Sequence, residues 1–166
     1  MRAAELIQTL ELQKHPEGGW FRETYRSEAT VHQNALPDGF SGNRRLSTAI
    51  YFLIEENNFS AFHRIKSDEV WHFYLGDALN VHIIWPTGLL ETIRLGSQMQ
   101  AGERLQYMVP ANVWFASEPA EGSTYSLVGC TVSPGFDFED FEMAQRDELI
   151  HQFPQHQDII KRLTRQ

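Results

Sequence analysis

Residues 59–76 read FSAFHRIKSDEVWHFYLG and carry more information about the fold than any other part of the chain. Two runs rich in aromatic and aliphatic residues, 59–65 and 69–75, stand on either side of a short Lys-Ser-Asp linker. Short runs of this kind, separated by turn-forming residues, predict β-strands. Strand alternation places His63 on the inward face of the first run and groups three residues on one face of the second: Glu69, Trp71 and Phe73.

The rest of the central chain repeats this succession of short apolar runs and turns. Further runs lie at 20–26, 47–54, 79–85, 89–95, 105–109, 114–117 and 124–132, and residues 32–43 are rich in Asn, Gly, Pro, Asp and Ser. Strands of this length and spacing are typical of an antiparallel sandwich or barrel. The sequence therefore predicts an all-β fold, a jelly-roll barrel of eight or more strands.

Helical patterns appear only at the two ends of the chain. Leu6, Ile7 and Leu10 recur at helical spacing, and the composition becomes acidic and helical after Pro134, with short helices expected at 143–150 and 157–163. We expect one domain over 1–166, made of a short N-terminal helix at about 2–14, a barrel at about 19–141 and a helical tail at about 142–166.

Composition excludes several classes of function. The chain has 166 residues and a net charge of −8, which disfavours binding to phosphate backbones and to anionic lipid surfaces. The single cysteine, Cys130, forms no internal disulfide and supplies no cysteine metal cage. No apolar run is long enough for a signal-peptide core or a membrane span. We therefore expect a cytoplasmic protein with no nucleic-acid or membrane partner.

The segment quoted above resembles the first sequence motif of the cupin superfamily, in which a Gly, two His, a Glu and a closing Gly recur at set spacing. His63, Glu69 and Gly76 match its first His, its Glu and its closing Gly. Asn57 stands at the opening Gly, and Ile65 stands at the second His.

Residues 104–115 resemble the second cupin motif. Pro110 matches, Asn112 replaces a turn Gly because Asn also tolerates the left-handed conformation, and Phe115 stands at the third His. Sites for Fe, Mn or Zn need at least three N or O donors at one point. With Ile65 and Phe115 apolar, we expect no native metal and no cofactor.

The whole chain supports a more specific resemblance. Its unusual strings are HPEGGWFRETY (15–25), STAIYFL (47–53), FHR (62–64), DEVWHFYLG (68–76) and PGFDFEDFE (134–142). Together they resemble the cupin-5 family (DUF985) from about residue 4 to about 148. The resemblance implies a jelly-roll barrel of the RmlC-like, sugar-nucleotide epimerase type. It also implies a homodimer and a hydrophobic pocket, and it implies no particular activity.

His63 and Glu69 are the candidate catalytic residues, at the polar end of a cavity. The cupin-like register places Glu69 at the start of the strand adjacent to that of His63, where cross-strand neighbours lie about 5 Å apart. An inward carboxylate needs a partner to offset its desolvation, and His63 or Arg64 is the nearest candidate. His72 is an odd number of residues from Glu69, so a regular pleat points it to the other face.

Six further side chains are predicted to bind the ligand. Trp71 and Phe73 share the face of Glu69, Phe115 stands at the lost metal position, and one face of the N-terminal strand carries Phe21, Glu23 and Tyr25. The alternative for the aromatic residues is that they fill the barrel. For Cys130 and for the other histidines, His15, His32, His82, His151 and His156, we expect packing or surface roles.

Three functions are compatible with these residues. The first is binding of a small organic molecule, sugar-like or metabolite-like, in an aromatic pocket. The second is an epimerase or isomerase that uses His63 as a general base and needs no metal. The third is a metal-dependent cupin with an incomplete site.

Overall fold

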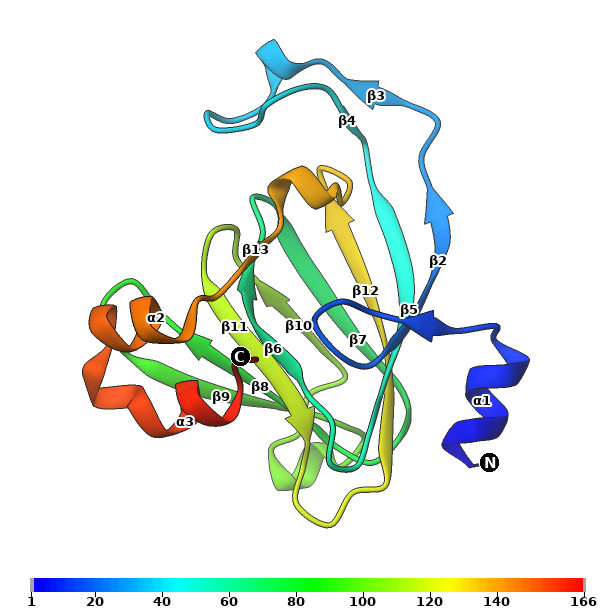
Figure 1. Ribbon diagram of the computed structural model, residues 1–166. Coiled ribbons are helices and arrows are strands. Elements are labelled where there is room, and N and C mark those ends of the chain that lie inside the picture. Colours follow the sequence, from blue (N-terminus) through cyan, green and yellow to red (C-terminus); the bar gives the residue numbers. More distant parts are fainter. Residues whose placement is uncertain (1, 166) are drawn as a thin grey trace.

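Two antiparallel β-sheets face each other and enclose the barrel interior in the computed structural model, which describes residues 2–165 (Figure 1). The larger sheet has six strands in the order β1-β2-β5-β12-β7-β10, and the smaller has five in the order β13-β6-β11-β8-β9. Neighbouring strands within both sheets pair antiparallel. The predicted all-β jelly roll is confirmed.

The strand bounds follow the predicted runs closely. The larger sheet comprises β1 (Gln13–Lys14), β2 (Trp20–Arg26), β5 (Thr48–Glu55), β12 (Tyr125–Ser133), β7 (Asp68–Gly76) and β10 (Gln106–Val109). The smaller sheet comprises β13 (Glu142–Met143), β6 (Ser60–Arg64), β11 (Trp114–Pro119), β8 (Leu79–Ile84) and β9 (Leu90–Leu95). The loop between β2 and β5 carries its own short pair, β3 (Thr30–Val31) and β4 (Arg44–Arg45).

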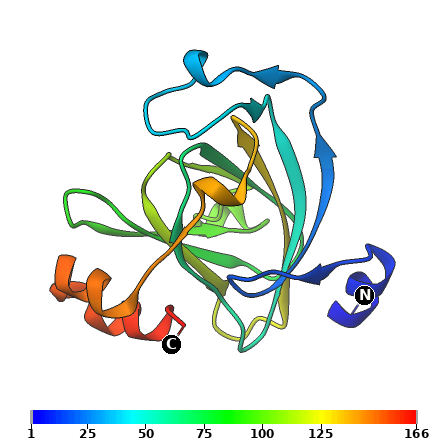
Figure 2. The same cartoon turned by 45° about the horizontal axis from the view of Figure 1, so that its top comes forward.

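Short helices lie at the ends of the chain and in the loops. They are α1 (Ala3–Thr9), α2 (Arg146–Gln152) and α3 (Gln157–Arg162), with the 3₁₀ turns η1 (Gln33–Ala35), η2 (Met99–Ala101), η3 (Phe138–Asp140) and η4 (Pro154–His156). Figure 2 shows α1 on one side of the barrel and the two C-terminal helices on the other. Within residues 2–165, no helix has the length and apolar character needed to cross a membrane.

The N-terminal helix ends earlier than expected. It stops at Thr9, and Glu11 adopts a positive φ of 53°, which a continuing α-helix does not allow. The residues that follow join the larger sheet, where Lys14 pairs with Trp20. The helix predicted from the apolar spacing is therefore present up to Thr9. After that point the pairing of β1 with β2 sets the backbone conformation.

The main hydrophobic core fills the barrel between the two sheets. Its largest members include Phe52, Trp71, Ile83 and Phe115, and the rings of Phe52 and Phe115 meet Trp71 edge-on at 5.9 and 6.0 Å. A second cluster, which includes Phe62, Trp114, Leu149 and Ile160, joins the smaller sheet to α2 and α3. A third joins α1 to the larger sheet through Leu6, Leu12, Leu53 and Leu127. Each sheet thus packs against helical structure from one end of the chain.

Candidate functional site

A cavity of about 230 Å³ lies between the sheets. Its inner side carries titratable side chains: His15, Glu17, His63, Glu69 and Cys130. Beside them lie Thr48 and the aliphatic residues Ile50, Ile65 and Val132. Its more exposed side carries Phe21, Glu23, Arg26, Phe136, Asp137 and Phe138. The arrangement gives a pocket with a buried acid and base cluster and apolar walls.

A tight turn before β2 positions Glu17. The N–H of Gly18 donates to the carbonyl of His15 (3.0 Å), and the N–H of Ala61 and Nε of Arg165 donate to the carbonyl of Glu17 (3.0 and 3.2 Å). Gly18 has φ of +114°, and a Cβ there would stand 2.0 Å from the carbonyl oxygen of Phe59. Only glycine fits this approach, so the turn holds the Glu17 side chain inward.

His63 and Glu17 form a buried pair. The Nε2 of His63 lies 3.1 Å from Oε2 of Glu17, and the two residues are 3% and 6% exposed. The Nδ1 of His63 lies 2.7 Å from the carbonyl oxygen of Ala61, which only accepts, so Nδ1 carries a proton. Burial lowers the pKa of His63 and raises the pKa of Glu17. The pair therefore holds one shared proton between Nε2 and the carboxyl.

His15 contacts the other oxygen of Glu17. The backbone N–H of Glu17 donates to Nδ1 of His15 (3.3 Å), which lies 3.7 Å from Oε1 of the same residue. Burial lowers the pKa of His15. The ring packs edge-on against Phe21 at 4.6 Å. His15 is therefore a neutral imidazole whose Nδ1 accepts a hydrogen bond.

Glu69 opens on the cavity from the larger sheet. It is 8% exposed and makes no ion pair with any residue of 2–165. Burial raises its pKa to about 7, with the nearby Glu17 raising it further and His63 opposing the shift. The Nε1 of Trp71 and the thiol of Cys130 lie close enough to lower the pKa slightly. Glu69 can therefore give or take a proton near neutral pH.

His63 and Glu69 both line the cavity, as expected, but they do not lie on paired strands. β6 belongs to the smaller sheet and β7 to the larger, so the two residues are not neighbours on paired strands. They approach from opposed sheets across the barrel interior. Arg64 points away and pairs with Glu142 at 2.7 Å, so it is no partner for Glu69. His72 bonds to Thr131 and Gln106, away from the cavity.

Of the six predicted ligand-binding residues, two line the cavity and four do not. Phe21 and Glu23 line it. Tyr25 is 54% exposed, because the pairing of β2 with β5 shifts by one residue between Glu23 and Tyr25. Such a bulge turns the following side chain to the opposite face.

The other three belong to the packed interior. Trp71 and Phe115 are fully buried members of the main core, and Phe73 packs against the same core. Each has the inward direction expected, but lies beyond the cavity wall. Phe115 still shapes the site, since its ring stands 4.2 Å from that of His63. The alternative that the aromatic residues fill the barrel was therefore right for these three.

Sequence reasoning missed the cavity residues that come from loops. His15 and Glu17 lie in the string HPEGG, and Phe136 and Phe138 lie in PGFDFEDFE. Both strings stood out as unusual, and either could have pointed to the site. Their loops hold no periodic pattern, so nothing in the sequence indicated which side chains point inward.

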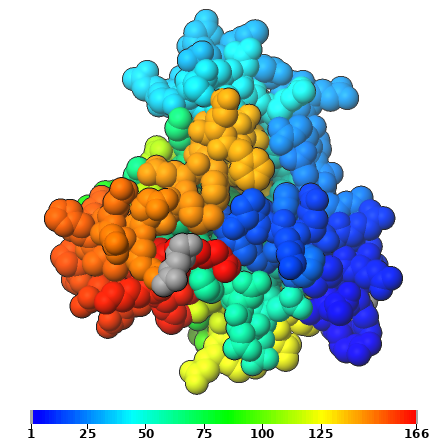
Figure 3. All heavy atoms as spheres, viewed as in Figure 1, coloured from blue at the N-terminus to red at the C-terminus, as the bar shows by residue number. Residues whose placement is uncertain are grey.

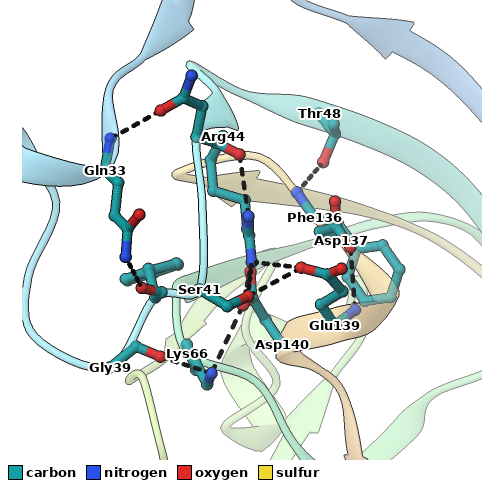
Figure 4. Close-up of polar contacts among 12 residues, drawn as sticks. Gln33, Gly39, Ser41, Arg44, Thr48, Lys66, Phe136, Asp137, Glu139 and Asp140 are labelled. Atoms are coloured by element: carbon teal, nitrogen blue, oxygen red, sulfur yellow. Dashed lines mark hydrogen bonds and ion pairs between the residues drawn. The ribbon is translucent and has the colours of Figure 1, made fainter.

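Residues 134–142, here called the closing segment, cross in front of the barrel in Figure 2, and Phe136, Asp137 and Phe138 of this segment line the cavity. The ring of Phe138 lies 6.2 Å from His15, and Figure 3 shows this segment against the N-terminal turn. Figure 4 shows what holds it: Nε and Nη2 of Arg44 donate to the two carboxylate oxygens of Asp140 at 2.7 and 2.8 Å. The N–H of Phe136 also donates to Oγ1 of Thr48 (2.9 Å). The buried Arg44–Asp140 pair thus fixes the closing segment to β4.

The site does not fit a metal of the kind that the cupin motifs bind. Ile65 presents an aliphatic side chain to the cavity, and Phe115 packs against His63 where a third His would stand. Among residues 2–165, no three His, Cys, Asp or Glu side chains are grouped so as to hold a metal ion. No chemistry is therefore assigned to a metal here.

Comparisons with known proteins show the family of the chain. A family model described as "Cupin superfamily (DUF985)" matches residues 4–144. The chain is 32% identical to the uncharacterized protein YML079W of Saccharomyces cerevisiae, over 89% of this chain and 78% of that protein.

Solved structures show the same likeness. Protein SO0799 of Shewanella oneidensis is 41% identical, with a TM-score of 0.88 over 99% of this chain and 98% of that one. A hypothetical protein from Leishmania major is 35% identical, with a TM-score of 0.89 over the full length of both chains. Oxalate decarboxylase of Bacillus subtilis, at 14% identity and a TM-score of 0.55 over 90% of this chain and 36% of that one, shares the fold alone.

Proposed function

The chain belongs to the DUF985 family of the cupin superfamily, and from this membership and the cavity we propose that it binds a small organic molecule inside the barrel. The observation that carries the proposal is the combination of Glu17, His63 and Glu69 at the buried side of one cavity with apolar side chains around them. Burying a titratable group costs free energy unless the group is paired or hydrogen-bonded. Clusters of such groups in a cavity are typical of sites that bind or transform a ligand. The volume of about 230 Å³ suits a molecule smaller than a typical drug.

The walls set the ligand's general shape. Phe21, Phe136 and Phe138 offer ring faces and edges on the open side, and Ile50 and Val132 offer aliphatic surface. Polar groups are concentrated on the buried side. A ligand with one polar end and an apolar body satisfies both parts of this cavity.

A second candidate is isomerase chemistry without a metal. Glu69 has its pKa raised to about 7 by burial, and it approaches the cavity from the sheet opposite His63. Two proton carriers on opposite sides of a substrate are what an isomerisation needs, since one removes a proton next to a carbonyl and the other returns one. In this reading Glu69 is the base in place of His63, because both ring nitrogens of His63 already have partners in Ala61 and Glu17, and the Glu17–His63 pair returns the proton that it shares.

A ligand screen tests the binding proposal. We expect a thermal-shift and ligand-observed NMR screen of small metabolites to find compounds that bind the wild-type protein. Their binding should disappear in Ile50→Trp, which fills the cavity, and weaken at least tenfold in His63→Asn. His151→Asn, a matched change at an exposed position, should leave the affinity unchanged. Binding that survives Ile50→Trp would place the ligand elsewhere and refute the proposal.

Deuterium exchange separates binding from isomerisation. A ligand found in the screen and incubated with protein in D₂O gains deuterium at carbon only if a side chain removes its proton. The isomerase candidate requires this exchange and its loss in Glu69→Gln. A ligand that binds and stays unlabelled supports binding alone.

A further inference from the structure

We propose that the ligand of this cavity is an organic amine, which presents its protonated nitrogen to Glu69 and lays an apolar body against the phenylalanine rings. The inference rests on the proposed binding function and names the chemical class of its ligand. The cavity is lined by several carboxyl groups, and some of them are already neutralised by neighbouring side chains.

Glu69 is a buried carboxyl whose favourable electrostatic neighbour, His63, already pairs with Glu17. It is 8% exposed, faces the cavity, and forms no ion pair with any of residues 2–165. The other buried carboxyls within residues 2–165 have partners: Glu17 pairs with His63, Glu103 with Arg94, and Asp140 with Arg44. An isolated buried carboxylate is unfavourable, and a cation in the cavity would remove the cost. The unmatched charge therefore points to a positively charged ligand group.

No neighbouring side chain is free to supply that charge. The single proton of the Glu17–His63 pair leaves the pair neutral, and His15 is held as a neutral imidazole by the N–H of Glu17. Arg165 is engaged by the carbonyls of Glu17 and Phe59 at 3.2 and 2.8 Å.

Arg26, on the open side, is neutralised as well. Its Nε and Nη2 donate to the two carboxylate oxygens of Glu23 at 2.9 and 2.7 Å. The thiol of Cys130 beside Glu69 stays protonated, because burial raises its pKa well above the ordinary value. The cavity as a whole has carboxyls in excess: Glu17, Glu23, Glu69 and Asp137 against one guanidinium. A ligand with a carboxylate or phosphate would meet repulsion.

The rings on the open side match the rest of such a ligand. Phe21, Phe136 and Phe138 line the cavity, and Phe136 and Phe138 meet edge to face at 5.0 Å. Aromatic faces attract organic cations and also bury apolar groups. A neutral alcohol or carbonyl compound would use the same rings, but it would need Glu69 in its protonated form as a hydrogen-bond donor. The two ligand classes therefore depend oppositely on pH.

Three matched probes distinguish these classes: 2-phenylethylamine, 2-phenylethanol and phenylacetate. They share a body and differ in the charge of the polar end. We expect the amine to bind the wild-type protein at least tenfold more tightly than the alcohol at pH 8, and phenylacetate not to bind. An alkyl amine, with a pKa of about 10, stays protonated from pH 6 to pH 8. Because Glu69 ionises near pH 7, amine affinity should rise about tenfold over that range.

A variant tests the residue itself. Glu69→Gln should lower amine affinity at pH 8 at least tenfold and should not weaken alcohol binding, because the glutamine amide donates a hydrogen bond as protonated Glu69 would. Glu28→Gln, at an exposed position, should change neither affinity. If Glu69→Gln does not fold, the comparison of probes and the pH dependence in the wild-type protein still decide the question.

Four outcomes would overturn the amine proposal: equal affinity for the amine and the alcohol, measurable binding of phenylacetate, amine affinity that falls from pH 6 to pH 8, or no binding of the amine at millimolar concentration. None of these contradicts the binding function, which the metabolite screen and Ile50→Trp judge separately. The two failures can therefore be told apart.

Discussion

Glu69 stays protonated in the folded protein at pH values at which a solvent-exposed glutamate is ionised. Its ordinary pKa is 4.5 and burial raises it to about 7, so between these values the folded protein holds a proton that the unfolded chain releases. The free energy of unfolding therefore falls as pH rises through this window. The cost of ionising the buried carboxyl is on the order of 3 kcal/mol above pH 7.

Glu69→Gln removes this pH dependence, because glutamine does not ionise. We expect the variant to match the wild-type protein at about pH 4.5 and to be more stable above pH 7, as measured by urea unfolding across the range. Glu28→Gln should follow the wild-type curve throughout. A stability difference between Glu69→Gln and wild type that does not change with pH would show that folding does not shift the pKa of Glu69.

The candidate site was predictable where strands carry it. Alternation placed His63 and Glu69 inward, and both line the cavity, although the pairing of β6 with β11 shifts by one residue between Ser60 and His63. Tyr25 was placed wrongly because the bulge in β2 breaks the alternation, and the sequence contains no sign of an extra residue in the pairing. Glu17 was missed because a loop places it, and alternation says nothing about a loop.

At the scale of elements, the sequence predicted the turns more accurately than it predicted the end of the first helix. Asn57 and Asn112, which stand where the motifs have glycine, both adopt a φ of 63°. This confirms for Asn112 that asparagine fills the left-handed turn. The helix was overextended because β1 gains its pairing from β2, a tertiary contact that local spacing does not reveal.

The buried Arg44–Asp140 ion pair is one anchor of the closing segment, beside the Phe136–Thr48 hydrogen bond and the Arg64–Glu142 ion pair. Arg44 holds Asp140 with two hydrogen bonds, and Lys66 lies 3.8 Å from the same carboxyl. Arg44→Lys keeps the charge and loses the paired geometry, which should cost about 2 kcal/mol. We expect hydrogen exchange, followed by mass spectrometry, to accelerate in residues 134–142 and to stay unchanged in β5 and β12.

Arg45→Lys is the matched control, since Arg45 is exposed and its guanidinium donates only to the carbonyl of Glu28 among the hydrogen bonds within residues 2–165. It should leave exchange in the closing segment as in the wild-type protein. Unchanged protection of residues 134–142 in Arg44→Lys would mean that the other contacts of the closing segment hold it without this ion pair.

At the scale of the whole molecule, the larger sheet is incompletely covered. β1 pairs only with Trp20 and Phe21, so within residues 2–165 the outer edge of β2 beyond Phe21 has no strand beside it. The same sheet leaves large side chains exposed: Tyr25, Tyr74 and Met108. Open edges and exposed apolar faces favour association. We therefore propose that two copies of the chain pack through this sheet.

Sedimentation velocity tests the homodimer and its location together. We expect the wild-type protein to sediment as a dimer at micromolar concentration and Met108→Glu to shift it towards monomer, because the new carboxylate would be buried without a partner in the interface. Leu89→Glu is the matched control: Leu89 is 61% exposed, against 44% for Met108, but lies in the turn between β8 and β9 of the other sheet. The Leu89→Glu variant should remain a dimer. A wild-type monomer at tens of micromolar would contradict the proposal, and a dimer that tolerates Met108→Glu but not Leu89→Glu would move the interface to the smaller sheet.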